Sequence, residues 1–201
     1  MPPTTSRFLA VLDACVLYGM PLRDTLLRVA EEGLYRPVWS HEIWNEVLRH
    51  LKDPMERKRP LTDDDATHLL TTIERHFPEA FVSNYENLIT TMTGDAEDRH
   101  VAAVAVHAQA QVIVTYNLRH FPTPSLAPYG IEAQHPDEFL MDLYDLAPRA
   151  MARIIRQQAA ALKRKPTSAH QILDKLAQVG VTRFAQAVRA YLDEDESTNT
   201  Q

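Results

Sequence analysis

Hydrophobic residues along the chain form short continuous runs that are separated by segments of helical spacing. Phe8–Leu12 belongs to an apolar run that Asp13 interrupts, and Val112–Val114 is a β-branched run too short for a helix. Both runs predict buried strands, and the second is typical of a central strand. Thr115–Asn117 places polar groups at the carboxyl end of that strand, where open α/β sheets bind ligands.

Helical spacing and capping residues occupy the intervals between the predicted strands. Leu22, Leu26 and Val29 share one side of a helix that Gly33 ends. The elements predicted up to residue 92 are a helix over 21–34, an extended segment over 36–39, a helix capped by Ser40, a helix capped by Thr62, a third strand over 78–82 and a short helix over 85–92. Strands that alternate with helices indicate an α/β fold with an open, mainly parallel central sheet flanked by helices.

The chain changes character from Asp145 onward, after an edge strand predicted to begin at Ile131 and the helix that it leads into. Pro136 helps to start a helix, and from Asp145 onward further helices follow, with breaks at Pro166 and Gly180. We therefore predict three regions, which are an α/β domain over residues 1–144, a small helical C-terminal extension over 145–192 and an acidic, disordered tail over 193–201.

The composition is that of a globular protein. The 201 residues are 45% hydrophobic and 24% charged, which is enough for one core plus an appendage. A net charge of -6 argues against a protein that coats nucleic acid indiscriminately, so any RNA contact must be local. The single cysteine, Cys15, fits a reducing cytoplasm, where we expect the protein to be located. No stretch approaches ~18 uninterrupted apolar residues, so we expect no membrane span.

Four carboxylates are candidates for chemistry. Asp95 and Asp98 lie three residues apart at the predicted start of a helix, where they can simply cap the helix or complement its dipole. Asp13 is harder to explain in this way, because a buried ionised carboxylate needs hydrogen bonds or a cation. Glu46 lies beside the apolar side of its helix, whereas Glu42, one turn earlier, is assigned to solvent.

The segments that carry these acids resemble a known family. The strand that ends V-L-D-A, the helical W-S-x-E-I-x-x-E-V, D-x-x-D-R-H-V-x-A-x-A and V-I-V-T-Y-N-L-R-H-F-P look like the PIN-domain ribonucleases, particularly the VapC-type toxins of toxin–antitoxin systems. The resemblance covers roughly residues 7–142, with its four segments in the expected order. Similar helical extensions follow the PIN domain in one branch of this family.

The resemblance implies a metal-dependent endoribonuclease. It matches Asp13, Glu46 and Asp98 to the family's catalytic, metal-binding acids and Asp95 to an accessory metal-binding acid. Asn117 stands where many members carry a fourth acid, which leaves a second metal site open. The resemblance also implies an RNA substrate, an antitoxin partner whose segment fills the acidic groove, and a homodimer.

Clustered carboxylates suit phosphodiester cleavage. They provide hard oxygen ligands for Mg²⁺ or Mn²⁺, and the chain has no paired histidines or cysteines that would favour zinc. We expect Thr115 to place its hydroxyl near the substrate phosphate, and Asp95 and Asn117 to act as outer ligands or to position water. Because three like charges repel one another, their pKa values should be coupled.

A basic stripe is the candidate RNA-binding surface outside the acidic site. Arg149, Arg153 and Arg156 share one helix face, with Lys163 two turns further on, and the segment 149–165 has no acidic residue. A solvated helix face opposite an apolar packing side is an equally good interpretation. The basic loop residues Arg57–Arg59 could contact phosphate, although we favour a solvated loop. We assign His120 and His135 to structural or surface positions.

The rival hypothesis is a PIN-like fold that binds RNA or a partner protein without cleaving RNA, and Asn117 is its best support. Other hydrolytic chemistries lack their motifs, since the chain has no H-E-x-x-H, G-x-S-x-G, P-loop or G-x-G-x-x-G. A phosphoaspartate hydrolase would need an acid at the position of Cys15.

Overall fold

The computed structural model describes residues 8–162 and 167–198. Residues 1–7, 163–166 and 199–201 lie outside these ranges. They include Lys163–Lys165 and the end of the predicted acidic tail. The chain divides into two compact units. The first comprises Met1–Tyr18 and Tyr35–Gln134, and the second comprises Gly19–Leu34 and His135–Gln201. The boundary predicted at residue 144 therefore differs from this division, because the second unit also takes in an early helix.

The first unit contains a four-stranded parallel sheet. Its strands are β1 (Leu9–Leu12), β2 (Arg36–Val38), β3 (Val112–Val114) and β4 (Glu132–Gln134), in the order β2-β1-β3-β4. Every adjacent pair is parallel, and Ala10 of β1 is paired with Pro37 on one side and Val112 on the other. The sheet ends at β4, which confirms the predicted edge strand.

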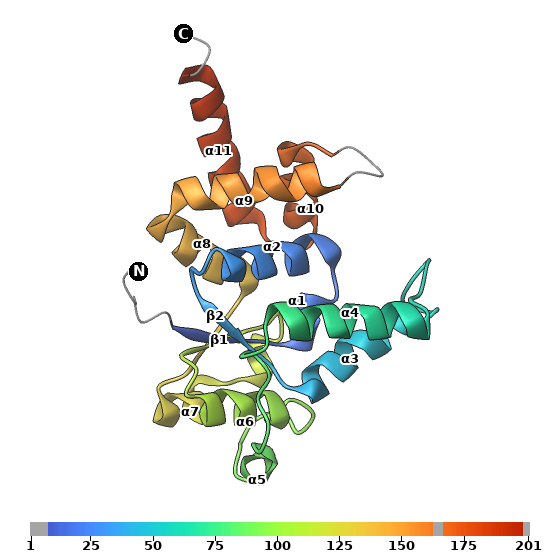
Figure 1. Cartoon of the computed structure of the whole chain (residues 1–201). Helices are drawn as coiled ribbons and strands as arrows, with labels where there is room; N and C mark the ends of the chain where they lie inside the picture. Colours follow the sequence, from blue (N-terminus) through green and yellow to red (C-terminus); the bar gives the residue numbers. More distant parts are fainter. Residues whose placement is uncertain (1–7, 163–166, 199–201) are drawn as a thin grey trace. The chain divides into compact units, whose positions relative to one another are not determined.

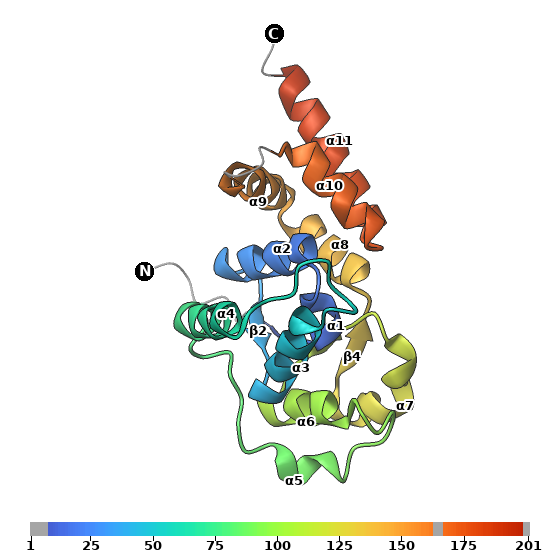
Figure 2. The ribbon, with the colours of Figure 1, turned by 90° about the vertical axis from the view of Figure 1, so that its right-hand side faces the viewer.

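Helices flank this sheet, as Figure 1 shows. They are α1 (Ala14–Leu17), α3 (His41–Lys52), α4 (Asp63–His76), α5 (Glu86–Ile89), α6 (Arg99–Ala108) and α7 (Thr123–Leu126), with 3₁₀ turns η1 (Leu118–His120) and η2 (Ala127–Tyr129). Helix α6 packs across β1, β2 and β3 with a side of small residues, and α5 lies beside α6 (Figure 2). The predicted α/β class is confirmed.

The predicted caps form. Ser40 Oγ accepts a hydrogen bond from the N–H of Ile43 at 3.2 Å, and the first turn of α3 follows directly. Thr62 and Asp65 make a reciprocal capping box at the start of α4. Each cap provides acceptors for amide groups that a helix cannot satisfy internally, so both helices begin where the sequence predicts.

The strand predicted over 78–82 is wrong. That segment contributes a single bridge, between Trp39 and Phe81, with hydrogen bonds from Trp39 N–H to Ala80 and from Val82 N–H to Trp39. The ladder cannot lengthen because Ser40, directly after Trp39, caps α3, and Pro78 has no N–H to donate.

The second unit is helical. It consists of α2 (Met20–Glu31), α8 (Pro136–Leu146), α9 (Pro148–Ala161), α10 (Ala169–Gln178) and α11 (Thr182–Thr198). Helix α9 packs against α2, α8, α10 and α11, and α11 also packs against α8 and α10. Among the described residues, no helix is both long and apolar enough to cross a membrane.

Two acidic features of this unit are the buried side chain of Asp137 and the acidic end of α11. Asp137, on α8, is only 8% exposed, and its carboxylate accepts hydrogen bonds from the N–H groups of Arg183 and Phe184 in the first turn of α11. Helix α11 itself continues through the acidic residues predicted to be disordered. Asp193 makes a 2.9 Å hydrogen bond with His170 of α10, and Asp195 lies 2.7 Å from Arg156 of α9, so a hydrogen bond and an ion pair hold this segment.

Candidate active site

Acidic side chains line a cleft of about 640 Å³ in the first unit. Its walls include Glu46 from α3, Asp98 from the amino end of α6, and Asn117 and His120 from the chain that follows β3. This is the carboxyl end of the parallel strands, where the sequence predicts ligand binding.

Asp13 is held directly after β1. Its N–H donates to the carbonyl of Val114, and its Oδ2 accepts hydrogen bonds from Thr115 Oγ1 at 2.7 Å and from Cys15 Sγ at 3.1 Å. The side chain is only 3% exposed. Burial raises the pKa of Asp13 above its ordinary value; the two hydrogen bonds oppose this rise, and the charges of Asp98 and Glu46 add to it.

Glu46 is paired with a buried histidine. Its Oε1 lies 3.1 Å from Nε2 of His100, a residue in the first turn of α6. Nδ1 of His100 lies 2.8 Å from the carbonyl of Glu97 and must carry a proton, since a carbonyl only accepts. Burial by itself would lower the pKa of His100, but the contact with Glu46 outweighs it and raises the pKa above 6.5. The contact therefore favours the protonated form of the imidazole beside the carboxylate.

Asp98 is held by a second histidine. Its Oδ2 lies 2.6 Å from Nδ1 of His120, while Nε2 of His120 accepts a hydrogen bond from Nε of Arg119 at 3.2 Å. Because the guanidinium only donates, Nε2 carries the lone pair and Nδ1–H donates to Asp98. The simple alternative made Asp95 the cap and placed Asp98 in the first turn, whereas Asp98 is itself the N-cap residue of α6 and its side chain makes no capping hydrogen bond.

Asp95 lies in the loop before α6. Its Oδ1 accepts a hydrogen bond from the N–H of Glu97, and its own N–H donates to the carbonyl of His120. Gly94 has φ +111°, and a Cβ added there would meet that carbonyl at 2.8 Å, so glycine allows the loop to approach η1 closely. Among the described residues, Asp95, Asp98 and His120 have possible metal-ligating atoms within 4.8 Å of one another.

Thr115 and Asn117 belong to the segment that directly follows β3. Thr115 is fully buried, and its hydroxyl donates to Asp13 while accepting from the N–H of Asn117 at 2.9 Å. Its hydroxyl is thus directed to a carboxylate. Asn117 lines the cleft.

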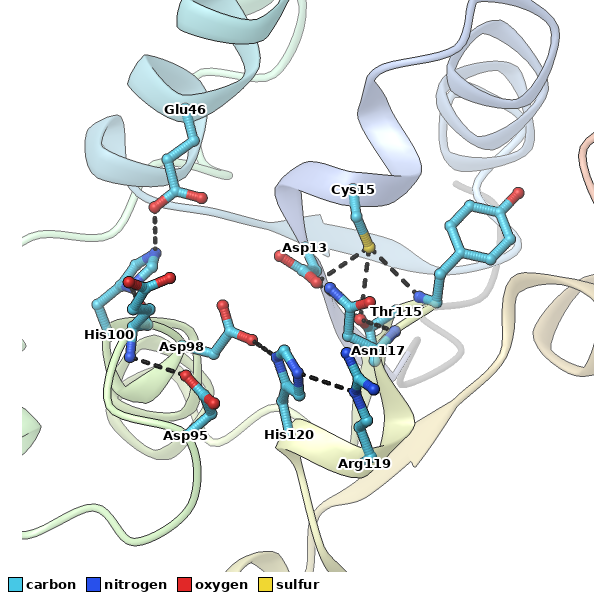
Figure 3. Close-up of polar contacts among 12 residues, drawn as sticks. Asp13, Cys15, Glu46, Asp95, Asp98, His100, Thr115, Asn117, Arg119 and His120 are labelled. Atoms are coloured by element: carbon cyan, nitrogen blue, oxygen red, sulfur yellow. Dashed lines mark hydrogen bonds and ion pairs between the residues drawn. The ribbon is translucent and has the colours of Figure 1, made fainter.

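Figure 3 shows Asp13, Asp98 and Asn117 pointing into a common space, with Glu46 turned toward His100. The structure thus gathers the predicted acids around one site, while each of the three principal acids has a protein partner. The predicted RNA-binding residues Arg149, Arg153 and Arg156 belong to the second unit, where Arg153 pairs with Glu32 and Arg156 with Asp195.

Two site residues were not identified from the sequence. His100 follows Asp98 by two positions, and His120 was assigned to a structural or surface position. His100 carried a usable signal, because a histidine in the first turn of a helix of small residues is unusual in a buried position. The contact of His120 depends on how the chain after β3 folds back on α6, which local patterns do not reveal.

Comparisons with known proteins agree with this geometry. A family model described as a PIN domain matches residues 9–119, and a model described as the VapC50 C-terminal domain matches residues 136–190. The chain is 44% identical over 110 residues to a Mycobacterium tuberculosis protein named "Putative ribonuclease VapC50". That alignment covers 55% of this chain and 64% of the relative, which is just under two thirds. The search of solved structures found no significant match.

These matches confirm the resemblance predicted from the four sequence segments. The PIN-domain model covers more than half of the chain, including β1, α3, α6 and β3. Glu46 and Asp98, which line the cleft, come from α3 and from the start of α6. The chain therefore belongs to the PIN-domain family.

Proposed function

We propose that the protein is a divalent-metal-dependent endoribonuclease that uses Mg²⁺ or Mn²⁺, and that it is the toxin of a toxin–antitoxin pair. One observation carries the proposal, namely that Glu46 and Asp98 line one cleft of a PIN domain and that Asp13 lies close enough for their charges to raise its pKa, although the three are far apart in the sequence. The printed name of the relative, a putative ribonuclease, supports the same reaction.

The donor set fits a hard divalent cation. Asp13, Glu46, Asp98 and Asp95 offer only carboxylate oxygens, which Mg²⁺ and Mn²⁺ prefer. The raised pKa of Asp13 fits as well, because a buried acid surrounded by other acids gains most from a neighbouring cation. When bound, such an ion would supply a nucleophilic hydroxide at neutral pH and stabilise charge on the phosphate.

The protein's own residues orient these acids. Thr115 and Cys15 both hold Oδ2 of Asp13, which leaves Oδ1 for other ligands. His100 holds one oxygen of Glu46, and His120, fixed by Arg119, holds one oxygen of Asp98. We assign Thr115 to orienting Asp13, and Asn117 and Asp95 to outer ligation or positioning of water. Arranged in this way, each of the three acids keeps one oxygen without a hydrogen-bond partner among the residues that the structure describes.

The decisive experiment replaces each acid with its amide. Asp13→Asn, Glu46→Gln and Asp98→Asn should each remove most Mg²⁺- or Mn²⁺-dependent cleavage of an RNA panel, roughly 100-fold or more, because the acids act as a unit. For the same reason, the triple variant should lose little more than the single ones.

Asp64→Asn is the matched control, since Asp64 is an exposed acid on α4. Cleavage that survives in the triple variant, or that falls equally in the control, contradicts the assigned site. A wild-type protein that binds RNA but cuts no member of the panel with either ion would instead support the non-cleaving PIN-like module.

The antitoxin and the homodimer remain predictions from the resemblance. Light scattering of the purified protein measures its oligomeric state directly. Co-expression with a small protein encoded beside its gene should suppress cleavage if the two form a toxin–antitoxin pair, and unchanged cleavage would remove the toxin assignment while leaving the nuclease.

A further inference from the structure

Helix α3 presents one side to the catalytic cleft. Glu46, Arg49, His50 and Asp53 follow the spacing i, i+3, i+4 and i+7, and all four line the cleft. The opposite side of α3 is buried in the core of the unit. A row of polar side chains therefore leads away from Glu46 along the wall of the cleft.

An aromatic pair lies in this wall. The ring of Tyr18 stacks on the imidazole of His50, with centroids 4.0 Å apart and an interplanar angle of 16°. Both residues are half-buried and both line the cleft. The backbone of Tyr18 is fixed as well, because its carbonyl accepts a hydrogen bond from Nη2 of Arg57 at 2.5 Å. The two rings thus form a preorganised, nearly parallel stack at the edge of the acidic site.

The chemistry of this wall differs from that of the acids beside it. Burial, with the nearby charges of Glu46 and Asp13, raises the pKa of Tyr18 to about 12, so the phenol stays neutral and adds no negative charge. Arg49 is exposed and, within residues 8–162 and 167–198, makes no salt bridge. A neutral aromatic face next to an unpaired guanidinium is the combination that binds single-stranded nucleic acid, in which bases stack on rings and phosphates meet cations.

We propose that Tyr18, His50 and Arg49 form a nucleotide-binding subsite in which a base next to the cleaved phosphate stacks on the Tyr18–His50 pair and a backbone phosphate binds Arg49. This inference rests on the proposed ribonuclease function and specifies its substrate class. A base can reach the pair only when it is unstacked from its neighbours, so the substrate is single-stranded RNA or a loop.

The test compares ring, hydroxyl and charge separately, with a single-stranded RNA that the wild type cleaves. Tyr18→Ala should raise KM tenfold or more, and Tyr18→Phe, which keeps the ring, should stay within about twofold of wild type. His50→Ala, which removes the ring beneath Tyr18, should give an intermediate rise. Arg49→Gln should lower the slope of log K against log salt by about 0.7.

A second readout does not require cleavage. In the Glu46→Gln background, an RNA that carries 2-aminopurine beside the cleavage position should lose fluorescence on binding, because the base stacks on the rings. The added Tyr18→Ala change should abolish this quenching, and Tyr18→Phe should retain it. His41→Ala is the matched control, since His41 is an exposed histidine of the same helix whose ring contacts Phe81 and lies outside the cleft lining.

Folding is controlled by Tyr18→Leu, which keeps bulk without an aromatic face and should show the same losses with an unchanged melting temperature. Divalent-ion affinity should be unchanged in all of the Tyr18 variants. If Tyr18→Ala and Tyr18→Leu retain wild-type KM and quenching, the subsite is wrong although the nuclease assignment stands. A wild-type protein that neither binds nor cuts RNA overturns the ribonuclease and the subsite together.

Discussion

Each principal acid of the site is held by a neighbour of different chemistry. A hydroxyl and a thiol hold Asp13, the imidazole of His100 lies against Glu46, and the imidazole of His120 holds Asp98. Each partner presents a hydroxyl, a thiol or a ring nitrogen to its carboxylate, and such contacts stabilise the ionised form. Substitutions at these positions should therefore change stability and ion binding in distinguishable ways.

Asp13 should destabilise the ion-free protein at neutral pH. Because the folded protein raises the pKa of Asp13 above 3.8, it binds a proton more tightly than the unfolded chain does. The resulting stabilisation is complete below the unfolded pKa and is lost as pH rises through the raised value. Asp13→Asn, which stays neutral, should raise the melting temperature at pH 7 in EDTA by a few degrees, about 2–4 °C per kcal/mol.

Thermal unfolding between about pH 4 and pH 8 measures this effect. The gain from Asp13→Asn should shrink as the pH approaches the unfolded value, and Asp64→Asn should show no such trend. A variant that is less stable than wild type at pH 7 would mean that the hydrogen bonds from Thr115 and Cys15 outweigh the cost of burial.

Asn117 tests whether the site is one acid short. Asn117→Asp adds a hard anionic ligand to the cleft, so Mn²⁺ should bind about tenfold more tightly in a calorimetric titration. Asn45→Asp adds the same charge at an exposed position of α3 and should have little effect. Equal affinities for wild type and Asn117→Asp would place residue 117 outside the ligand shell.

Among single residues, the sequence indicated the candidate acids, but it indicated the side chains that contact those acids only in part. Asp13 was conspicuous because a carboxylate interrupts an apolar run. His120 was not, because it contacts a residue 22 positions earlier in the chain, and no local period connects the two. Thr115 was identified, but its hydroxyl faces Asp13 because the ends of β1 and β3 lie side by side.

Among the helices, termini were easier to predict than the pairing of short extended segments. Ser40 and Thr62 mark the starts of α3 and α4, because each side chain accepts a hydrogen bond from a backbone N–H in the first turn that follows it. The segment over 78–82 had the composition of a strand, but pairing requires a neighbouring strand with free hydrogen-bonding groups, and Trp39 is followed at once by a helix. Local chemistry decides the first case and the tertiary neighbour decides the second.

The start of α11 depends on an acid from another helix. Asp137→Ala removes a buried carboxylate that accepts two amide hydrogen bonds, so the helical unit should lose about 1–2 kcal/mol of stability. Hydrogen exchange at the amides of residues 183–185 should accelerate most. Glu138→Ala, at the next and exposed position of α8, is the control. Unchanged exchange at these amides would show that the cap contributes nothing.

For the molecule as a whole, the basic stripe formed by Arg149, Arg153 and Arg156 offers less unpaired positive charge than its sequence indicates. Arg153 and Arg156 are paired with Glu32 and Asp195, which leaves Arg149 as the stripe residue with no salt bridge inside the described ranges. If the stripe contacts RNA, Arg149→Gln should lower the slope of log K against log salt by about 0.7, and the triple Gln variant should lower it little further.

Fluorescence anisotropy with a single-stranded RNA at several salt concentrations provides that slope. Divalent-ion affinity should not change, since these residues belong to the other unit. If all of the variants keep the wild-type slope, the stripe does not bind RNA and instead faces solvent or binds a protein partner.

The division into two units was beyond the reach of local patterns. Helix α2 has the amphipathic spacing of any surface helix, and nothing in residues 19–34 indicates that its apolar side packs against helices from the end of the chain. The sequence therefore predicted a linear boundary, whereas the second unit is assembled from two separated segments.

That arrangement has a consequence while the protein is being made. Helix α2 leaves the ribosome early, but α9, which packs against it, begins only 117 residues after α2 ends (148 − 31), or roughly 6–23 s of translation at ~5–20 residues per second. During this interval the apolar side of α2 is open to chaperones or to other nascent chains. A protein fragment made from a messenger truncated before α9 would keep the apolar side of α2 exposed. Such a fragment should be a target for proteolysis.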